Sequence, residues 1–275
     1  MAEHTHYSER IKAFLTVTAE KTRAFLNRIV ASAAFQKAAD FLKWSNLRSR
    51  LLYVRDTVWE FTKQQPKTAC FIYVCLFCAF SIAFLDEPVA LSALKTSRTS
   101  LIFYITQLNP AGWWFLILIA LWLVYMAVAG LSLTTDDFEK NMVKARAVLF
   151  VLLALSLSSL VTWVINILTG RYTPEFMDTM NLYGFSAMRF RVSETSFPSF
   201  DVQSIWAVAM AAGTYFPKIR RWFCGIAGVI TIALVWTAEC FISDAVMGMY
   251  IGIIMYYAAK WIVSENRENF PLISL

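Results

Sequence analysis

Residues 113–131 read WWFLILIALWLVYMAVAGL, an apolar run without a charged side chain. A helix needs about 20 largely apolar residues to cross the ~30 Å hydrocarbon layer of a bilayer. The tryptophan pair at the start of the run is suited to the level of the lipid headgroups. The segment therefore predicts a transmembrane helix.

Five further segments predict membrane spans of the same kind. They are residues 68–85, 148–168, 202–216, 222–238 and 245–263. The segment 202–216 is short and rich in alanine, which favours a helix packed inside a bundle over one that faces lipid. Glycines should let later helices approach closely, and these are Gly225, Gly228, Gly248 and Gly252. We expect an all-α polytopic membrane protein with a bundle of six transmembrane helices.

The composition agrees with a membrane protein. Hydrophobic residues make up 58% of the chain and charged residues 16%, against about 45–50% and 25% in soluble domains. Three of the five cysteines fall in the first predicted span, where a thiol is an ordinary buried small hydrophobe. We therefore predict neither a disulfide framework nor a bound cofactor.

The basic residues predict the orientation of the spans. With the N-terminus inside, twenty of the 25 Lys and Arg residues fall on the cytoplasmic side, including a loop at 140–146, and five fall opposite. Cytoplasmic loops of membrane proteins carry such an excess. The first residues, MAEHTHYSER, lack the apolar core of a signal peptide, so an internal span should direct insertion. Both termini are expected in the cytoplasm.

The chain divides into an N-terminal arm at 1–67, a membrane domain at 68–263 and a short tail at 264–275. The arm alternates apolar and basic residues near helical spacing. This pattern predicts basic amphipathic helices, which lie in the membrane surface and attract anionic lipids. Packing of the arm on itself or on a protein partner is an equal alternative, and nucleic-acid binding is disfavoured beside a membrane anchor. The basic residues of this surface are Arg10, Lys12, Arg23, Arg28, Arg48, Arg50 and Arg55.

Ionisable residues mark the extracytoplasmic ends of the later spans. The loop at 169–201 is long and rich in charged and aromatic residues, and Asp201, Glu239 and Asp244 each stand where a span begins or ends. We expect these three carboxylates at about the same membrane depth. Charged groups at such positions are costly to desolvate, so they are candidates for function.

Three short motifs surround these residues. Residues 166–174 read NILTGRYTP, residues 198–201 read PSFD, and Cys240 is followed by Asp244 and Gly248. In order and spacing they resemble the motifs of the type 2 phosphatidic acid phosphatase superfamily: Lys, six residues and Arg-Pro; Pro-Ser-Gly-His; and His, three residues, Asp and a later Gly. The FLDEP at 84–88 and the GWW at 112–114 are also similar to family members. The resemblance covers residues 68–263 and implies a six-span phosphatase fold, with its site facing outward from a bacterial inner membrane.

The resemblance also implies roles that this chain has lost. In the family a Lys, two Arg and the Ser hold the phosphate, one His attacks phosphorus with support from the Asp, and a second His protonates the leaving group. The second Arg falls here near Leu234, and the two histidines of the chain, His4 and His6, lie in the arm. The degenerate motif positions, in family order, are Asn166 for the Lys, Thr173 for the first Arg, Ser199, Asp201 for a His, Cys240 for the attacking His, and Asp244.

Several interpretations of these residues remain open. A phosphate or other ligand would be held by the remaining cations and the serine, namely Arg171, Arg189, Arg191 and Ser199. Cys240 could act as a nucleophile only as a thiolate, which needs neighbouring positive charge. A hard cation such as Mg²⁺ has weak candidate ligands in Asp201, Glu239 and Asp244. Alternatively, the carboxylates simply pair with the arginines and fix the loop.

The joint loss of the phosphate clamp and both histidines favours a catalytically inactive homologue, a pseudoenzyme that binds a lipid or a membrane partner. One alternative is an active lipid phosphate phosphatase or phosphotransferase that uses Cys240 or a bound metal. Another is a lipid transporter or flippase, although the spans carry almost no ionisable residue of the kind that ion-coupled pathways need. Membrane lipids are the expected partners, and the sequence predicts no particular oligomeric state.

Overall fold

The computed structural model describes residues 44–95, 111–188, 190 and 194–265. Contacts between residues divide the chain into two compact units, residues 1–70 and 71–275. Several residues of the predicted surfaces lie outside the described ranges, namely Arg10, Lys12, Arg23, Arg28, Arg189 and Arg191.

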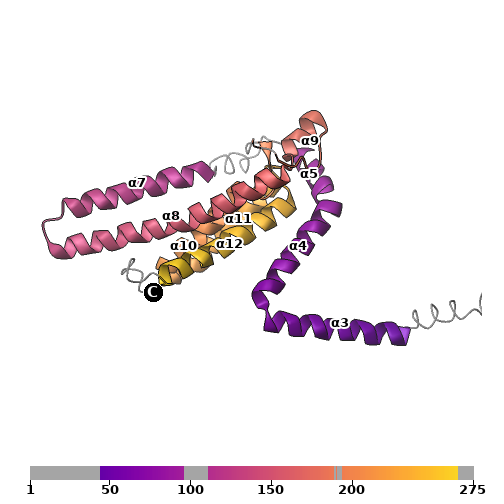
Figure 1. Cartoon of the computed structure of the whole chain (residues 1–275). Helices are drawn as coiled ribbons and strands as arrows, with labels where there is room; N and C mark the ends of the chain where they lie inside the picture. Colours follow the sequence, from indigo (N-terminus) through magenta and orange to yellow (C-terminus); the bar gives the residue numbers. More distant parts are fainter. Residues whose placement is uncertain (1–43, 96–110, 189, 191–193, 266–275) are drawn as a thin grey trace, which may run out of the picture. The chain divides into compact units, whose positions relative to one another are not determined.

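Apart from two isolated bridges in one loop, the regular structure of the described residues is helical, and the all-α prediction is confirmed (Figure 1). The first unit contains α3 (Trp44–Gln64), and α4 (Pro66–Phe84) runs from it into the second. The second unit continues with α5 (Asp86–Lys95), α7 (Ala111–Gly130), α8 (Thr135–Thr169), α9 (Pro174–Met180), α10 (Phe200–Tyr215), the 3-10 turn η2 (Pro217–Ile219), α11 (Arg220–Trp236) and α12 (Ile242–Glu265).

Among the described residues, five helices are long and apolar enough to cross a membrane, and the chain is an integral membrane protein. They are Pro66–Phe84, Gly112–Gly130, Thr135–Thr169, Pro217–Trp236 and Ile242–Glu265. The remaining predicted span, residues 202–216, corresponds to α10, whose 16 residues reach only about 24 Å at the rise of an α-helix. Most of its side chains are buried, which confirms the predicted interior helix, but a count of six spans is not established.

Helix α8 begins well before its predicted span. The loop expected at 140–146 is helical, because the hydroxyl of Thr134 accepts a hydrogen bond from the backbone N–H of Asp137 and caps the helix at Thr135. Asp136 and Asp137 in the first turn also suit the positive end of the helix dipole. Helix α8 ends at Thr169 and is capped by Gly170, whose φ of 56° is the left-handed conformation that glycine adopts readily.

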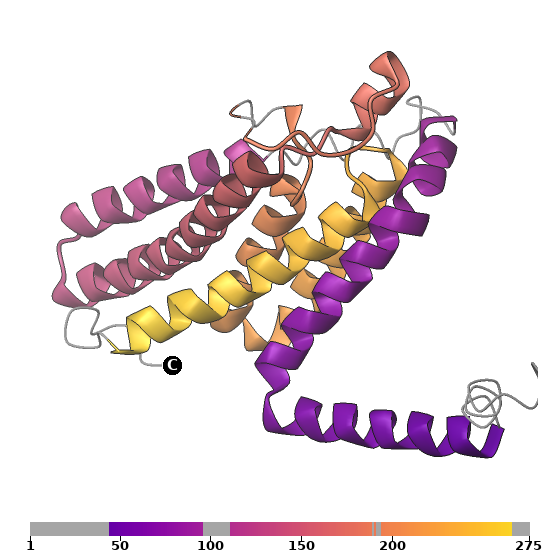
Figure 2. The ribbon, with the colours of Figure 1, turned by 45° about the vertical axis from the view of Figure 1, so that its right-hand side comes forward.

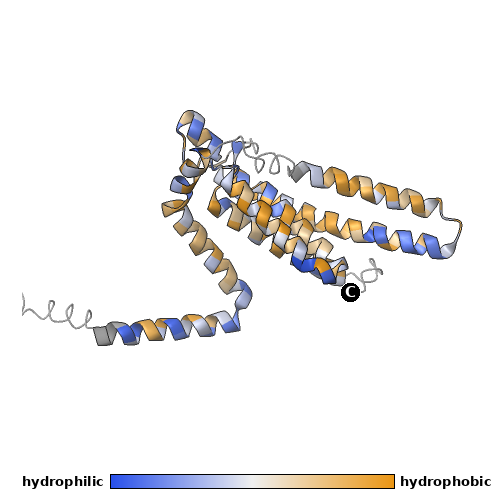
Figure 3. Cartoon of the chain, turned by 180° about the vertical axis from the view of Figure 1, so that it is seen from behind, coloured by the Kyte–Doolittle hydropathy of each residue, from blue (hydrophilic) through white to orange (hydrophobic). Residues whose placement is uncertain are grey.

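The interior of the second unit centres on α10, which packs against α8, α11 and α12 (Figure 2). Side chains of α7, α8, α10 and α12 build the largest buried apolar cluster. Figure 3 shows α7 apolar along its length and the beginning of α8 hydrophilic. Leu116 and Leu123 of α7 are 61% and 53% exposed, as suits side chains that face lipid tails.

Two glycines set how closely α12 approaches α10. A Cβ at Gly248 would lie 2.7 Å from the backbone oxygen of Ser199, and one at Gly252 would lie 2.6 Å from that of Gln203. These positions therefore require glycine, as predicted for close helix packing. The same prediction is wrong for Gly225 and Gly228, where a Cβ would meet nothing within 4 Å.

Candidate functional site

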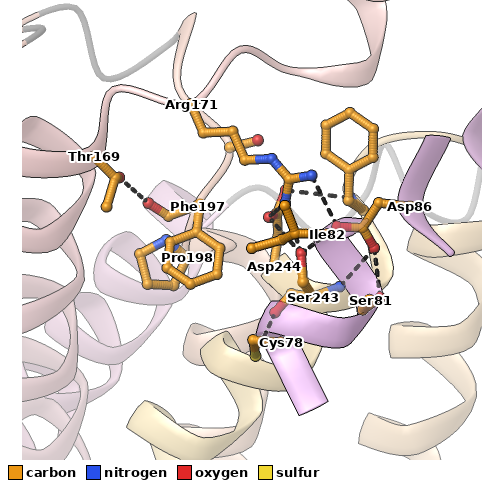
Figure 4. A network of polar contacts seen from close by, with 12 residues as sticks. Cys78, Ser81, Ile82, Asp86, Thr169, Arg171, Phe197, Pro198, Ser243 and Asp244 are labelled. Atoms are coloured by element: carbon orange, nitrogen blue, oxygen red, sulfur yellow. Dashed lines mark hydrogen bonds and ion pairs between the residues drawn. The ribbon is translucent and has the colours of Figure 1, made fainter. Parts of the chain in front are cut away.

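A buried arginine lies at the centre of the candidate site. Arg171, in the loop after α8, is 0% exposed. Its Nη2 lies 2.8 Å from Oδ2 of Asp86, and its Nη1 lies 2.5 Å from Oδ1 of Asp244 (Figure 4). Both carboxylates are also fully buried. One guanidinium thus faces two carboxylates that come from the starts of α5 and α12.

Hydroxyl and backbone groups complete the hydrogen bonds of Asp86. Ser81 donates to its Oδ1 over 2.7 Å, and the backbone N–H of Ser243 donates to the same oxygen over 3.1 Å. The Ser243 hydroxyl donates to Oδ2 of Asp86 and lies 2.6 Å from Nη1 of Arg171. The network therefore joins the end of α4, the start of α5, the loop after α8 and the start of α12.

Aromatic rings cover the guanidinium. The Cζ of Arg171 lies 4.1 Å from the ring centroid of Phe241 and 5.4 Å from that of Phe185, within the range of a cation–π interaction. The Tyr183 hydroxyl accepts from Nη2 of Arg171 over 3.3 Å and donates to the backbone oxygen of Ile82 over 2.9 Å. Water is thereby excluded, which strengthens the ion pairs.

The carboxylates keep this buried guanidinium charged. Burial alone lowers the pKa of Arg171, but Asp244 and Asp86 more than offset this and raise it. Burial also raises the pKa of Tyr183, which therefore stays a neutral phenol at physiological pH. The positive charge of Arg171 is neutralised by two fixed carboxylates, so no net positive charge is left to hold an anion.

Four of the degenerate motif positions gather around the start of α10. The Asn166 amide donates to the backbone oxygen of Pro198 over 2.9 Å. The backbone N–H of Ser199 donates to the backbone oxygen of Asp244 over 3.1 Å, and the Ser199 hydroxyl caps α10. Cys240 is 5% exposed, and it lies in a buried apolar cluster with Val202 of α10 and Ala245 of α12. The structure thus brings Asn166, Ser199, Cys240 and Asp244 together.

The remaining described candidates lie in three different settings. Thr173 precedes α9 and makes no side-chain cap, Asp201 lies in the first turn of α10, and Glu239 is exposed. Among the residues described, which include all the proposed metal ligands, no three His, Cys, Asp or Glu side chains lie close enough to hold a metal ion.

The environment of Cys240 disfavours a nucleophilic thiolate. Burial raises the pKa of this thiol well above its ordinary value, and Asp244 raises it further. A reactive cysteine needs the opposite, a lowered pKa in partly exposed, electropositive surroundings. Cys240 is therefore a neutral buried thiol at physiological pH.

The sequence interpretation in which carboxylates pair with the loop arginines is confirmed for Arg171 and Asp244. The parts of the network that it missed are Asp86 and its serine partners. A signal was available, since an acidic residue directly follows the apolar run of α4, where charged groups are expensive. Nothing in the local sequence indicates that Arg171 is its partner, because the two lie 85 residues apart.

An apolar pocket lies beside this network, between α5, α11 and α12. It has a volume of about 340 Å³. Its two hydroxyls bond within their own helices, Ser92 to the oxygen of Val89 and Thr231 to that of Ala227. The pocket therefore offers apolar walls and satisfied hydroxyls. Its lining residues are Val89, Ser92, Ala93, Thr231, Ile232, Val235, Trp236, Ile242, Ala245 and Val246.

Comparison with known families matches residues 147–268 to the PAP2 superfamily. No curated protein matches the chain. Among solved structures, the chain is similar to the first transmembrane PAP2 type phosphatidylglycerolphosphate phosphatase from Bacillus subtilis. That likeness has a TM-score of 0.49 and 17% identity, and covers 72% of this chain and 96% of the other. The family match confirms the resemblance noted in the motifs.

Proposed function

We propose that this chain, whose residues 147–268 match the PAP2 superfamily, is a catalytically inactive homologue that binds a membrane lipid. The observation that carries the proposal is the engagement of Asp244. In the family the corresponding Asp supports the attacking His. Here its Oδ1 is bound by Arg171 at 2.5 Å, and its Oδ2 accepts from the backbone N–H of Phe241 at 3.3 Å.

Phosphoryl transfer relies on cations that clamp the phosphate oxygens and on a positioned nucleophile. Arg171 is paired with two carboxylates, so an incoming phosphate would meet like charge. Two unit charges 4 Å apart interact by about 4 kcal/mol at an effective dielectric near 20. Cys240, in the place of the attacking His, is buried and has a raised pKa. Neither the cationic clamp nor the nucleophile is in place, which argues against hydrolysis by the family mechanism.

The apolar pocket supports a lipid as the ligand. Ligand pockets span about 300–1,000 Å³, and a pocket of about 340 Å³ fits one hydrocarbon chain better than two. Water binds poorly in an apolar cavity, because it finds few hydrogen-bond partners there. Helices α11 and α12 are both candidate spans, so lipid chains surround the pocket. Its walls share α5 and α12 with the Arg171 network.

A phosphate-release assay tests the catalytic half of the proposal. The purified protein, shown to be folded, would be given a panel of lipid and polyprenyl phosphates with and without Mg²⁺. We expect no release above that of a Cys240→Ser variant. Release that depends on Cys240 or on the metal would establish a rebuilt active site and overturn the proposal.

Lipid binding can be tested by photo-crosslinking in liposomes that contain a lipid with a diazirine on its acyl chain. We expect labelled peptides from α5, α11 and α12 by mass spectrometry. Ala93→Phe fills the pocket and should reduce this labelling several-fold. Leu91→Phe, at a position 42% exposed on the same helix and outside the pocket lining, is the matched control and should leave it unchanged. Equal labelling of both variants would contradict binding in this pocket.

A further inference from the structure

Helix α3 carries an apolar stripe that nothing described in the structure covers. Leu51, Val54, Val58 and Phe61 follow one another at steps of three and four residues, which places them on one face of the helix. They are 57%, 55%, 43% and 37% exposed. Exposed apolar side chains gathered on one face mark a surface that meets a membrane or a partner.

The charges of α3 are arranged around this stripe. At about 100° per residue, Arg48 and Arg55 border one edge of the stripe and Arg50 borders the other. Asp56 and Glu60 fall on the opposite face. Positive charge therefore flanks the apolar surface, and negative charge points away from it.

We propose that α3 lies in the surface of an anionic bilayer, with its apolar stripe among the lipid chains and its flanking arginines at the lipid phosphates. Interfacial helices have this arrangement of an apolar face with basic edges. Anionic headgroups attract Lys and Arg near the surface. The inference is independent of the proposed function, because α3 lies outside residues 147–268, which match the family.

The position of α3 along the chain supports the same conclusion. The helix ends at Gln64, and the candidate span α4 begins at Pro66. Only Gln65 separates them, and one residue spans at most about 3.6 Å. The end of α3 is therefore held at the boundary of the bilayer, where a headgroup surface is always within reach.

The same charges disfavour a second copy of the chain as the occupant. The stripe has the spacing of a coiled-coil seam, in which the flanking positions face their counterparts on the partner helix. In α3 these flanks hold Arg48, Arg50 and Arg55 and no acidic residue, so two identical helices would repel each other. Arg55 also pairs with the neighbouring Asp56 at 2.7 Å, but an exposed pair of this kind is weak and leaves the arginine available to phosphates.

Hydrogen–deuterium exchange of the full-length protein tests the proposal. The protein would be placed in nanodiscs that each hold one chain, made either of phosphatidylcholine alone or with part of it replaced by phosphatidylglycerol. We expect exchange of the α3 amides to slow by on the order of tenfold in the anionic discs. Added salt should remove most of this protection, because it screens charges at the surface.

Three variants separate charge from fold. Arg48→Gln with Arg50→Gln and Arg55→Gln should lose the protection, whereas the matched triple change to Lys should keep it, because a bilayer surface responds to charge. Val54→Asp with Val58→Asp keeps the arginines but interrupts the apolar stripe. This variant should also lose the protection in anionic discs.

Equal exchange of the unaltered α3 in neutral and anionic discs would overturn the proposal. So would protection that appears only with two chains per disc, or loss of protection in the Lys variant, which would indicate a protein partner that recognises arginine. If the Gln variant does not fold, the Lys and Asp variants still decide the question.

Discussion

The buried network and α3 both depend on arginine, but they use this residue type in different ways. Arg171 is 0% exposed and is held by two carboxylates and an aromatic ring. Arg48, Arg50 and Arg55 are exposed beside the apolar stripe of α3. A buried charge must be matched at short range, since its desolvation is expensive. An exposed charge acts at longer range and yields to salt. We therefore expect substitutions of Arg171 to lower the stability of the fold. Substitutions on α3 should instead weaken its binding to the membrane surface.

The largest difference between the two regions should appear when an arginine is removed from each. Arg171→Met leaves Asp86 and Asp244 buried without a cation, and should lower the free energy of unfolding by about 3–5 kcal/mol. Arg55→Met on α3 should change it by less than about 0.5 kcal/mol. Thermal and denaturant unfolding in detergent measure both. Similar losses for the two variants would show that burial does not govern the role of these arginines.

A second contrast concerns glycines in packed and open positions. Gly252→Ala brings a Cβ within 2.6 Å of the Gln203 oxygen and 3.0 Å of the Ala207 nitrogen, both of them backbone atoms that cannot turn aside. We expect a loss of about 1–3 kcal/mol in unfolding free energy. Gly225→Ala on α11 meets nothing within 4 Å, and the better helix propensity of alanine should make it neutral or slightly stabilising. The same unfolding experiments decide whether α12 depends on this close approach.

These contrasts also separate what the sequence could predict from what it could not. Membrane spans are local signals, so the apolar runs correctly located α4, α7, α11 and α12. The early start of α8 was also encoded locally, in the Thr134 cap and the acidic residues after it, but a search for apolar runs passes over such a polar helical turn.

The candidate site shows the same limit at longer range. Motif spacing grouped Asn166, Ser199 and Cys240, because family motifs record residues that meet in space. The pairing of Arg171 with Asp86 spans 85 residues, and no local pattern encodes such a contact. Close packing at Gly248 but not at Gly225 likewise depends on which helix lies opposite. Glycine spacing alone cannot tell these two cases apart.

The two regions each contain a cation over an aromatic ring, which allows a direct comparison of one interaction in two environments. Phe241 lies under Arg171 with the Cζ 4.1 Å from the ring centroid, and Trp59 on α3 lies under Lys63 at 5.2 Å. Phe241→Leu should lower the unfolding free energy by about 1–2 kcal/mol, because the interaction is desolvated. Trp59→Leu should leave unfolding nearly unchanged. It should instead weaken protection of α3 in anionic nanodiscs, where a tryptophan is suited to the interface. An unfolding cost for Trp59→Leu equal to that for Phe241→Leu would remove the distinction.

The smallest expected effect comes from one hydroxyl. Tyr183→Phe removes the hydrogen bond to the Ile82 oxygen at 2.9 Å and the longer contact with Arg171, and should cost about 0.5–1.5 kcal/mol. Tyr53→Phe on α3, at a position 73% exposed, is the control and should cost nothing measurable.

The effect of Tyr183→Phe should also depend on pH. Burial raises the pKa of Tyr183 in the folded protein, whereas the unfolded chain deprotonates near pH 10. The contribution of this phenol is therefore complete below about pH 10 and is lost as the pH rises toward the folded pKa. The difference in unfolding free energy between the unaltered protein and Tyr183→Phe should stay constant from neutral pH to about pH 9 and narrow above that. A gap that widened at alkaline pH would mean that the folded protein stabilises the phenolate, through Arg171, more than burial opposes it.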